Sequence, residues 1–330
     1  MLKTRRLGRT GPAVPAIGLG CMGMSFAYGP ADESQCLRTL HRSLELGANF
    51  WDTAEIYGPY KNEELLGKAL EGRRDKVVVA TKFAWRIGPN GERVKLDGSR
   101  ANMRRALEGS LKRLRTDHVD LFYQHRLDPA IPIEETVAGM AELVREGKVR
   151  HIGLSEVGPV TLRKAHAVHP LAALQSEYSL WETGVEANVL PVLRELGIGL
   201  VAYSPVGRGF LAGALRTLSD IPVGDFRRGV PRFQEGNFQD NLRLVSAVRE
   251  LARAKGATPA QIALAWLLHK GQDIVPIPGT TKTEHLEENV RAADIALSQR
   301  DWAEVEGILK RFPPAGARYP ESMMRLVDVP

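Results

Sequence analysis

Four residues whose side chains can take part in proton transfer stand where short apolar runs of the chain end. Asp52 and Tyr57 are five positions apart after one run, Lys82 closes the next run, and His125 follows a third. If these runs are neighbouring parallel strands, their carboxyl ends meet at one edge of the sheet, where barrel enzymes build their sites. The spacing therefore predicts one polar cluster containing a carboxylate, a phenol, an ammonium and an imidazole.

The chemistry of such a cluster depends on the tyrosine. An unperturbed phenol has a pKa near 10, about three units too high for efficient proton exchange at neutral pH. The ammonium of Lys82 would stabilise the phenolate of Tyr57, and the carboxylate of Asp52 would hold Lys82 charged and aimed. His125 would orient a substrate oxygen by a hydrogen bond. The cluster could then polarise a carbonyl and protonate it as a hydride arrives, or run in reverse with an alcohol.

Each of the four residues also has a purely structural interpretation. Asp52 could cap a helix, Tyr57 could pack at a rim, Lys82 could be solvated, and His125 could be a buried, hydrogen-bonded histidine. Four such residues at the ends of three successive runs favour a site instead. A hydride donor is still required, and the sequence contains no constellation of metal ligands that would offer other chemistry.

The elements that must position these residues alternate along the chain. Short β-rich runs alternate with longer helical patterns, which is typical of βαβ units on a parallel sheet. Eight apolar runs end near Gly20, Trp51, Thr81, Tyr123, Leu154, Leu174, Ala202 and Ile277. Helical patterns lie near 32–46, 61–71, 99–114, 133–147, 158–168, 185–196, 241–255 and 283–294. Eight such pairs predict an α/β fold, a closed (β/α)8 TIM barrel.

Three segments fall outside this repeat. Residues 4–14 contain a Gly-Pro turn between short extended pieces and predict a β-hairpin that caps the bottom of the barrel. Residues 205–240 are too long for an ordinary βα loop and are expected to cover a site. Ser298 is a plausible N-cap for an extra C-terminal helix, which a proline-containing tail follows. We expect residues 1–330 to form one domain, with the 205–240 loop and the 311–330 tail over the barrel mouth.

Composition argues against several classes of partner. The 45 basic and 39 acidic side chains give a formal charge of +6, but they are scattered and no aromatic series accompanies them. This makes nucleic acid a poor candidate. Cys21 and Cys36 lack zinc-site spacing and are expected to be reduced thiols. The N-terminus lacks the apolar core of a signal peptide, and no apolar run reaches about 18 residues. We therefore expect a soluble, cytoplasmic protein with no membrane partner.

Two short motifs resemble nucleotide-enzyme signatures and are rejected. Residues 18–23 match G-x-G-x-x-G, with Asp52 placed as the acid of a Rossmann fold, but Gly29-Pro30 follows where the phosphate-binding helix should run. Tyr57 and Lys61 match the Y-x-x-x-K pair of short-chain dehydrogenases, which requires a helix that the intervening Gly-Pro disfavours. Tyr57 must therefore find its lysine elsewhere, and Lys82 is the candidate.

The later loops favour a nucleotide as the hydride donor. Ser155 and Gln175 follow the fifth and sixth runs and could bind an amide such as that of nicotinamide. Residues 203–209 read Tyr-Ser-Pro-Val-Gly-Arg-Gly, offering an aromatic face and small residues that let backbone amides approach a pyrophosphate. Residues 279–282 read Gly-Thr-Thr-Lys before a helix start, which is the usual phosphate position on a barrel, although an ordinary capped loop would look the same.

Taken together, these motifs resemble those of aldo-keto reductases over essentially the whole chain. The Tyr-Gln-His-Arg at 123–126, the Leu-Ser-Glu at 154–156 and the 203–209 run are most similar to bacterial and plant members acting on general aldehydes and ketones. By this resemblance, Tyr57 is the proton donor and His125 orients the substrate. Asp52 and Lys82 are implied to be the pair that activates the tyrosine.

The resemblance also implies that the barrel binds a nicotinamide nucleotide without a Rossmann domain. Lys282 would meet a 2′-phosphate, and Glu156 stands where steroid-type members have Asn. His285 replaces the arginine of many NADPH-preferring members and lacks its bidentate fork. NADPH is the expected cofactor, with use of NADH also allowed. The residues expected to bind it are Gly20, Met22, Asp52, Ser155, Glu156, Gln175, Tyr203, Ser204, Pro205, Val206, Gly207, Arg208, Gly279, Thr280, Thr281, Lys282, His285, Glu288 and Asn289, the last two at the adenine.

A second class of function stays open at this point. Potassium-channel β-subunits resemble the same family, so the chain could be a non-catalytic, nucleotide-binding regulatory subunit. The intact catalytic set and the absence of an N-terminal inactivation extension favour an enzyme acting on a small carbonyl compound. Apolar walls for that substrate are expected from Met22, Phe26, Tyr28 and Trp85. The sequence indicates neither the physiological substrate, nor the oligomeric state, nor the preferred direction of reaction.

Overall fold

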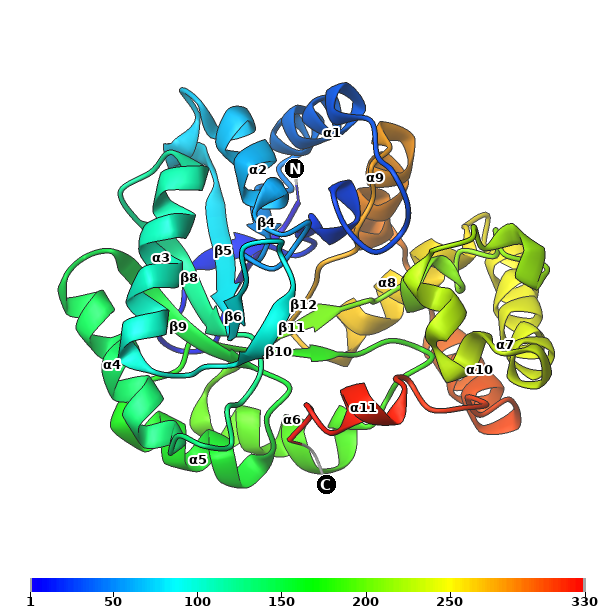
Figure 1. Ribbon diagram of the computed structural model, residues 1–330. Helices are drawn as coiled ribbons and strands as arrows, with labels where there is room; N and C mark the ends of the chain where they lie inside the picture. Colours follow the sequence, from blue (N-terminus) through cyan, green and yellow to red (C-terminus); the bar gives the residue numbers. More distant parts are fainter. Residues whose placement is uncertain (1, 329–330) are drawn as a thin grey trace.

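The computed structural model describes residues 2–328 and contains one eight-stranded parallel sheet (Figure 1). The strands follow chain order around the sheet: β3 (Leu19–Gly20), β4 (Phe50–Asp52), β5 (Val78–Phe83), β8 (Val119–Gln124), β9 (Val149–Ser155), β10 (Ala173–Glu177), β11 (Gly199–Tyr203) and β12 (Ile274–Pro276). Two hydrogen bonds join the last strand to the first. The amide of Gly18 donates to the carbonyl of Pro276 at 3.0 Å, and that of Gly20 donates to Pro278 at 3.2 Å. The predicted barrel and its eight strands are confirmed.

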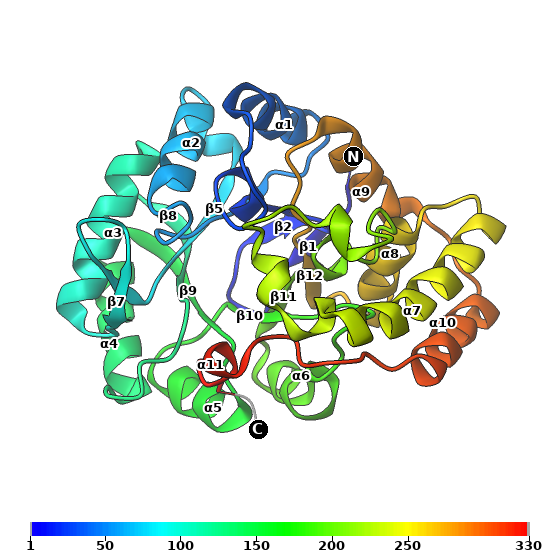
Figure 2. The ribbon, with the colours of Figure 1, turned by 45° about the vertical axis from the view of Figure 1, so that its right-hand side comes forward.

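Helices surround the barrel (Figures 1 and 2). They are α1 (Glu33–Glu45), α2 (Lys61–Leu70), α3 (Arg100–Leu114), α4 (Ile133–Arg145), α5 (Pro159–Val168), α6 (Val185–Leu196), α9 (Thr283–Arg291) and α10 (Gln299–Arg311), each within three residues of its predicted bounds. Side-chain caps fix several of their starts. Asp32 accepts from the amide of Gln35 at 2.6 Å, and Ser298 forms a capping box with Asp301, as its predicted N-cap role requires.

The region between β11 and β12 differs from the prediction. It contains α7 (Glu235–Ala254), which begins before the predicted 241–255 pattern, and a second helix, α8 (Pro259–Lys270), which was not predicted. α8 packs on β12, whereas α7 packs on α8 and α10, so α8 is the barrel helix and α7 lies outside it. The reason is burial: residues 260–267 of α8 are all buried, so this helix has no polar face to reveal its period.

Two hydrophobic cores connect the sheet, the helices around it and the N-terminal hairpin. The larger core lies between the sheet and the helices and takes residues from both. The smaller one fills the barrel with Phe50, Leu121, Val201 and other inward-facing strand residues. The N-terminal hairpin, β1 (Thr4–Arg6) and β2 (Ala13–Pro15), belongs to the smaller core through Val14 and the adjoining Leu7. The predicted hairpin is therefore present and closes the bottom of the barrel with apolar side chains.

Three further segments lie near the opposite end of the barrel. The loop after β5 carries an unpredicted hairpin, β6 (Trp85–Ile87) and β7 (Arg93–Leu96). The connection from β11 to α7 is a series of short 3₁₀ turns. Beyond α10 the chain passes through α11 (Glu321–Met324) toward α5, where the carboxylate of Asp328 accepts from Thr161 at 2.5 Å (Figure 2). Within residues 2–328 no helix is long and apolar enough to cross a bilayer.

The contact between α2 and α3 depends on one glycine. A Cβ at Gly67 would lie 2.1 Å from the carbonyl oxygen of Arg113, so Gly67→Ala forces the helices apart. We expect Gly67→Ala to lower the free energy of unfolding by about 1–3 kcal/mol, despite alanine's higher helix propensity. The same change at Gly307 in α10, where a Cβ meets nothing within 4 Å, should instead raise it by about 0.5–1 kcal/mol. Urea denaturation followed by circular dichroism tests both, and a stabilised Gly67 variant contradicts the packing argument.

Candidate active site

The polar cluster follows from the alternation of side chains along the strands. Successive residues of a strand point to opposite faces of the sheet. Interior core residues Phe50, Ala80 and Ala173 are each followed, two positions later, by the polar residues Asp52, Lys82 and Gln175. The barrel is therefore filled by apolar side chains along most of its length and becomes polar at the carboxyl ends of its strands.

Lys82 occupies the centre of this polar layer. Its side chain is 0% exposed, and its Nζ donates to Oδ1 of Asp52 at 2.5 Å and to the carbonyl oxygen of Thr53 at 2.7 Å. The third contact of Nζ, at 3.4 Å, is with the hydroxyl of Tyr57. The other carboxylate oxygen of Asp52 accepts from Nε2 of Gln175 at 2.7 Å. Tyr57 therefore meets Lys82, whereas Lys61 is an exposed residue at the start of α2.

Burial and neighbouring charges shift the pKa values of Tyr57 and Lys82 in opposite directions. Burial raises the pKa of Tyr57, although the Lys82 ammonium pulls that pKa downward. Burial alone would lower the pKa of Lys82, but Asp52 and Tyr57 together raise it above its usual value. Burial has the larger effect, so the pKa of Tyr57 lies above its ordinary value even though Lys82 acts on it in the expected, downward direction. The phenol is consequently protonated at neutral pH.

His125 lies beside Tyr57 in an aromatic setting. Its ring makes edge contacts with Tyr57 and Trp85, at centroid distances of 5.8 and 5.0 Å. Its Nδ1 is buried without a hydrogen-bond partner among residues 2–328, which leaves Nε2 as the nitrogen that faces the cavity. Burial, with the positive charges of Lys82 and two arginines, holds the pKa of His125 well below its usual range. The imidazole is therefore neutral and can donate one hydrogen bond.

One cavity of about 830 Å³ brings nearly all predicted site residues together. Asp52, Tyr57 and His125 line it at one end, and Lys282 and Asn289 line it toward α9. All four predicted substrate-lining residues, Met22, Phe26, Tyr28 and Trp85, are in its wall. Three predicted residues do not line it: Lys82 lies behind Tyr57, and Glu156 and Gly207 are directed elsewhere. The 204–209 loop and the tail residue Tyr319 contribute further wall.

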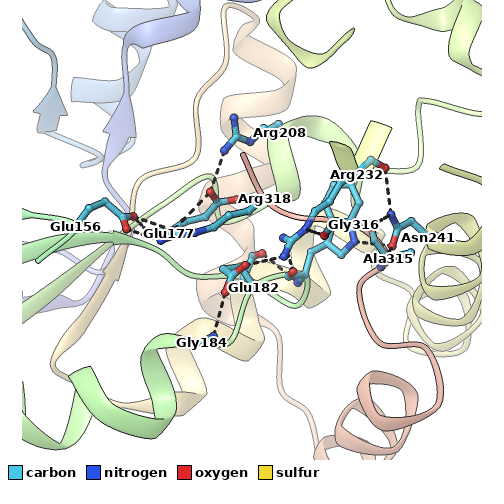
Figure 3. Close-up of polar contacts among 12 residues, drawn as sticks. Glu156, Glu177, Glu182, Gly184, Arg208, Arg232, Asn241, Ala315, Gly316 and Arg318 are labelled. Carbon is cyan, nitrogen blue, oxygen red and sulfur yellow. Dashed lines mark hydrogen bonds and ion pairs between the residues drawn. The ribbon is translucent and has the colours of Figure 1, made fainter. Parts of the chain in front are cut away.

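Glu156 lies in a network of ion pairs that ties the tail to the barrel (Figure 3). Both of its carboxylate oxygens accept from Arg318, at 3.0 and 2.6 Å. The neighbouring Glu177 accepts from Arg208 at 2.9 Å and lies 3.9 Å from Arg318. The guanidinium of Arg208 is thus committed to Glu177, and the carboxylate of Glu156 to Arg318. Arg208 still lines the cavity, whereas Glu156 does not.

Two loops have backbone geometry suited to close approach by a ligand. Ser204, Gly207, Arg208 and Gly209 all have positive φ, at 50°, 55°, 57° and 85°. Two non-glycine residues in this region carry strain, which is concentrated at functional sites in proteins. At the other loop, a Cβ on Gly279 would lie 3.0 Å from the carbonyl oxygen of Gly20, so only glycine keeps that wall open. Both loops can therefore present backbone amides to a phosphate group.

The rejected Rossmann fingerprint is absent from the structure. Residues Met22–Met24 form a single 3₁₀ turn after β3, so no helix begins at the last glycine of the motif. Two arginines that the sequence did not single out, Arg93 and Arg126, also line the cavity beside His125. Arg126 follows His125 directly in the sequence, a signal that could have found it. Arg93 gave no such signal because it comes from the unpredicted β6–β7 hairpin.

Comparison with known proteins agrees with this arrangement. Residues 16–310 match the model of the aldo/keto reductase family. The chain belongs to this family. "Probable aldo-keto reductase 1" of Glycine max is 44% identical over 317 residues, which cover 95% of this chain and 91% of the relative. The protein is accordingly an oxidoreductase of the aldo-keto reductase type.

Solved structures place the fold in the same family. The glycerol dehydrogenase AKR11B4 from Gluconobacter oxydans superimposes with a TM-score of 0.85 at 29% identity, covering 95% of this chain and 97% of that chain. An aldo/keto reductase from Klebsiella pneumoniae, solved with NADP and acetate, gives a TM-score of 0.74 at 31% identity, covering 97% and 99%. The aldo-keto reductase barrel is therefore shared along nearly the full length of these chains.

Glu55, two residues before Tyr57 in this reductase, links stability to pH. Burial raises its pKa to about 7, against the pull of Arg105, whose Nη2 lies 3.3 Å from Oε2. The folded carboxyl keeps its proton where the unfolded one loses it, so the protein loses stability as pH rises from about 4.5 to about 7. Glu55→Gln removes this loss, and its stability relative to the native chain should rise over that range, by at most about 3 kcal/mol.

Urea denaturation at several pH values measures this difference, with the same change at exposed Glu64 as the control. A Glu55→Gln variant whose stability difference from the native chain stays constant between pH 4.5 and 7.5 would show that Glu55 titrates alike in the folded and unfolded states.

Proposed function

We propose that this chain is an NADP(H)-dependent reductase of aldehydes and ketones, with Tyr57 as the proton donor to the carbonyl oxygen. The observation that carries the proposal is the buried Lys82 ammonium, which contacts both the Asp52 carboxylate and the Tyr57 hydroxyl. A buried phenol beside a charged lysine can give up its proton only where a new acceptor arrives, since the lysine then stabilises the phenolate left behind. The cavity at Tyr57 is the place where such an acceptor can enter.

In this proposal the substrate oxygen lies between Tyr57 and His125. The phenol donates one hydrogen bond and then its proton, and the neutral imidazole of His125 donates the second through Nε2. Because His125 is neutral, it orients the oxygen without competing as an acid. Lys82 moves no proton to the substrate; its charge offsets the negative charge that appears on Tyr57. The nicotinamide, when bound, supplies the hydride to the carbonyl carbon.

The cavity residues fit a nicotinamide dinucleotide along its length. Ser155 and Gln175 offer polar groups at the catalytic end, and the ring of Tyr203 forms an adjacent wall. The 204–209 loop and Gly279 allow close approach to a pyrophosphate, and Lys282 is an exposed cation at the N-terminus of α9. Structures of Klebsiella pneumoniae aldo-keto reductases are described with NADP and with NADPH, which supports the same cofactor here.

The proposal also covers how the chain is organised around the cavity. We propose that the whole chain acts as one catalytic domain, with the β11–α7 connection and the tail covering the cavity. Both contribute to its wall, through Leu215 and Phe226 from the connection and Tyr319 and Met323 from the tail. A purely regulatory, nucleotide-binding role has no specific feature of residues 2–328 in its favour, since the catalytic set is assembled.

Tyr57→Phe tests the assignment of the proton donor. The change removes one hydroxyl from a fully formed site, so we expect turnover of 4-nitrobenzaldehyde with NADPH to fall by about 100-fold or more. NADPH binding, followed by fluorescence titration, should change by less than about threefold, because the hydroxyl contacts Lys82 rather than the nucleotide walls. Tyr60→Phe is the matched control, since that hydroxyl makes no hydrogen bond within residues 2–328 and lies outside the cavity wall. Retained turnover in Tyr57→Phe would refute the role.

Lys282→Ala tests the assignment of the 2′-phosphate site. Loss of a charge-assisted contact should raise the KM for NADPH by about tenfold to a hundredfold and leave the KM for NADH much less affected. Lys61→Ala removes an exposed lysine outside the cavity and is the control. Equal effects of Lys282→Ala on the two nucleotides would show that the lysine does not meet the phosphate that distinguishes them.

A further inference from the structure

Arg126 is a buried cation without a counter-ion. It is 7% exposed, yet no carboxylate within residues 2–328 lies within 4.0 Å of its nitrogens. The hydrogen bonds of its Nη1 are to neutral oxygens, the carbonyl of His125 at 2.9 Å and the hydroxyl of Ser155 at 3.3 Å. A charge removed from water without an opposite charge nearby is costly, so buried arginines are usually paired.

Three other arginines of the same region, of which Arg232 is buried and two are partly buried, pair with carboxylates. Arg318 pairs with Glu156 at 2.6 Å, Arg208 with Glu177 at 2.9 Å, and Arg232 with Glu182 at 2.7 Å (Figure 3). Both oxygens of Glu156 accept from Arg318. Burial lowers the pKa of Arg126, but Tyr203, Tyr319 and the more distant Glu156 raise it. Arg126 differs from these three arginines and also lies in the cavity wall beside His125. Buried Arg5 likewise has no ion pair among residues 2–328, but it donates three hydrogen bonds to backbone carbonyls.

A second unpaired cation lines the same end of the cavity. Arg93, from β7, has no carboxylate within 4.0 Å among the residues that the structure describes. Its guanidinium carbon lies 4.9 Å from the ring centre of Trp85 and 5.9 Å from that of Phe26. Trp85 in turn contacts the ring of His125. One aromatic ring thus separates this guanidinium from the imidazole, and its placement over Trp85 is a cation–π contact that leaves its N–H groups free to bind an anion.

The remaining charges at this end cancel. Asp52 and Lys82 neutralise each other, and burial keeps His125 uncharged. Arg227, which lines the cavity under Tyr28, pairs with Asp225 at 2.7 Å. Arg93 and Arg126 are consequently the cations of the cavity wall near His125 that have no carboxylate within 4.0 Å among residues 2–328.

We propose that the substrate end is built for carbonyl compounds that carry a carboxylate, which Arg126 and Arg93 bind while the carbonyl oxygen meets Tyr57 and His125. This inference rests on the proposed function, because it names the substrate class of the same site. Neither arginine belongs to the 204–209 loop or to the segment around Lys282, where the phosphates of a nucleotide are assigned. Arg126 donates to the backbone carbonyl of His125, whereas the ring of Trp85 lies between Arg93 and the His125 imidazole.

The test compares two aldehydes that differ in charge and little in shape, 4-carboxybenzaldehyde and its methyl ester. A charge-assisted contact is worth about tenfold to a hundredfold in affinity, so kcat/KM with NADPH should favour the carboxylate by at least about tenfold. Arg126→Gln and Arg93→Gln should each reduce that preference several-fold, mainly through KM. Arg86→Gln changes an exposed arginine of the same hairpin that lies outside the cavity wall and should keep the preference intact.

Equilibrium binding gives a readout that does not depend on turnover. Calorimetry in the presence of NADP⁺ should show benzoate binding at least about tenfold more tightly than benzamide, with the difference reduced in Arg126→Gln and Arg93→Gln and diminished by salt. Because Arg93 is exposed, its variant stays informative if the buried Arg126→Gln variant fails to fold.

The outcomes separate the two proposals. Reduction of both aldehydes without preference for the carboxylate, or equal losses for both in the arginine variants, overturns the inference and leaves the proposed reductase standing. Selective benzoate binding that Arg126→Gln and Arg93→Gln reduce, without reduction of either aldehyde, supports the anion site and counts against the proposed reaction. Selective binding that neither variant changes overturns the assignment to the arginines. Equal binding of benzoate and benzamide overturns the anion site whatever the turnover.

Discussion

The site depends on keeping a fully buried ammonium charged. Removing the charge of Lys82 from water is costly, and the barrel offsets that cost with the Asp52 carboxylate, the Thr53 carbonyl and the Tyr57 hydroxyl. These partners come from β4 and the loop after it, and Gln175 on β10 fixes the second oxygen of Asp52 from across the barrel. Closure of the sheet therefore contributes to the site, because it brings β10 opposite β4 and keeps these contacts away from water.

Pairing of buried charge also organises what surrounds the site. Glu156 and Glu177, at the ends of β9 and β10, hold Arg318 of the tail and Arg208 of the β11–α7 connection. These segments carry Tyr319 and much of the 204–209 loop into the cavity wall. The carboxylates of Glu156 and Glu177 thus attach two separate segments of the chain to one barrel.

The sequence predicted those features that follow from local pattern. Asp52, Lys82 and Gln175 could be placed because strand alternation is local and strand ends share one edge. Three other features could not be predicted. The helix α8 is apolar on nearly every face, so no period marked it. The partner of Glu156 is Arg318, 162 positions away in a tail without periodic structure, so only the folded chain shows that this carboxylate is occupied. The upward pKa of Tyr57 likewise required knowledge of burial, which spacing alone does not give.

Charge is unevenly paired around the cavity, because Asp52 and Lys82 neutralise each other whereas Arg93 and Arg126 have no carboxylate within 4.0 Å among residues 2–328. With Asp52 and Lys82 paired and His125 neutral, the reacting centre imposes shape and hydrogen bonds but little net charge. In the proposed function, the residues around that centre would therefore discriminate among carbonyl compounds. The aromatic walls of Phe26 and Trp85 accept many shapes, whereas a guanidinium selects by charge. In the proposed reductase, a centre of little net charge leaves the choice of substrate to residues such as Arg93, which the β6–β7 hairpin carries outside the eight-stranded sheet.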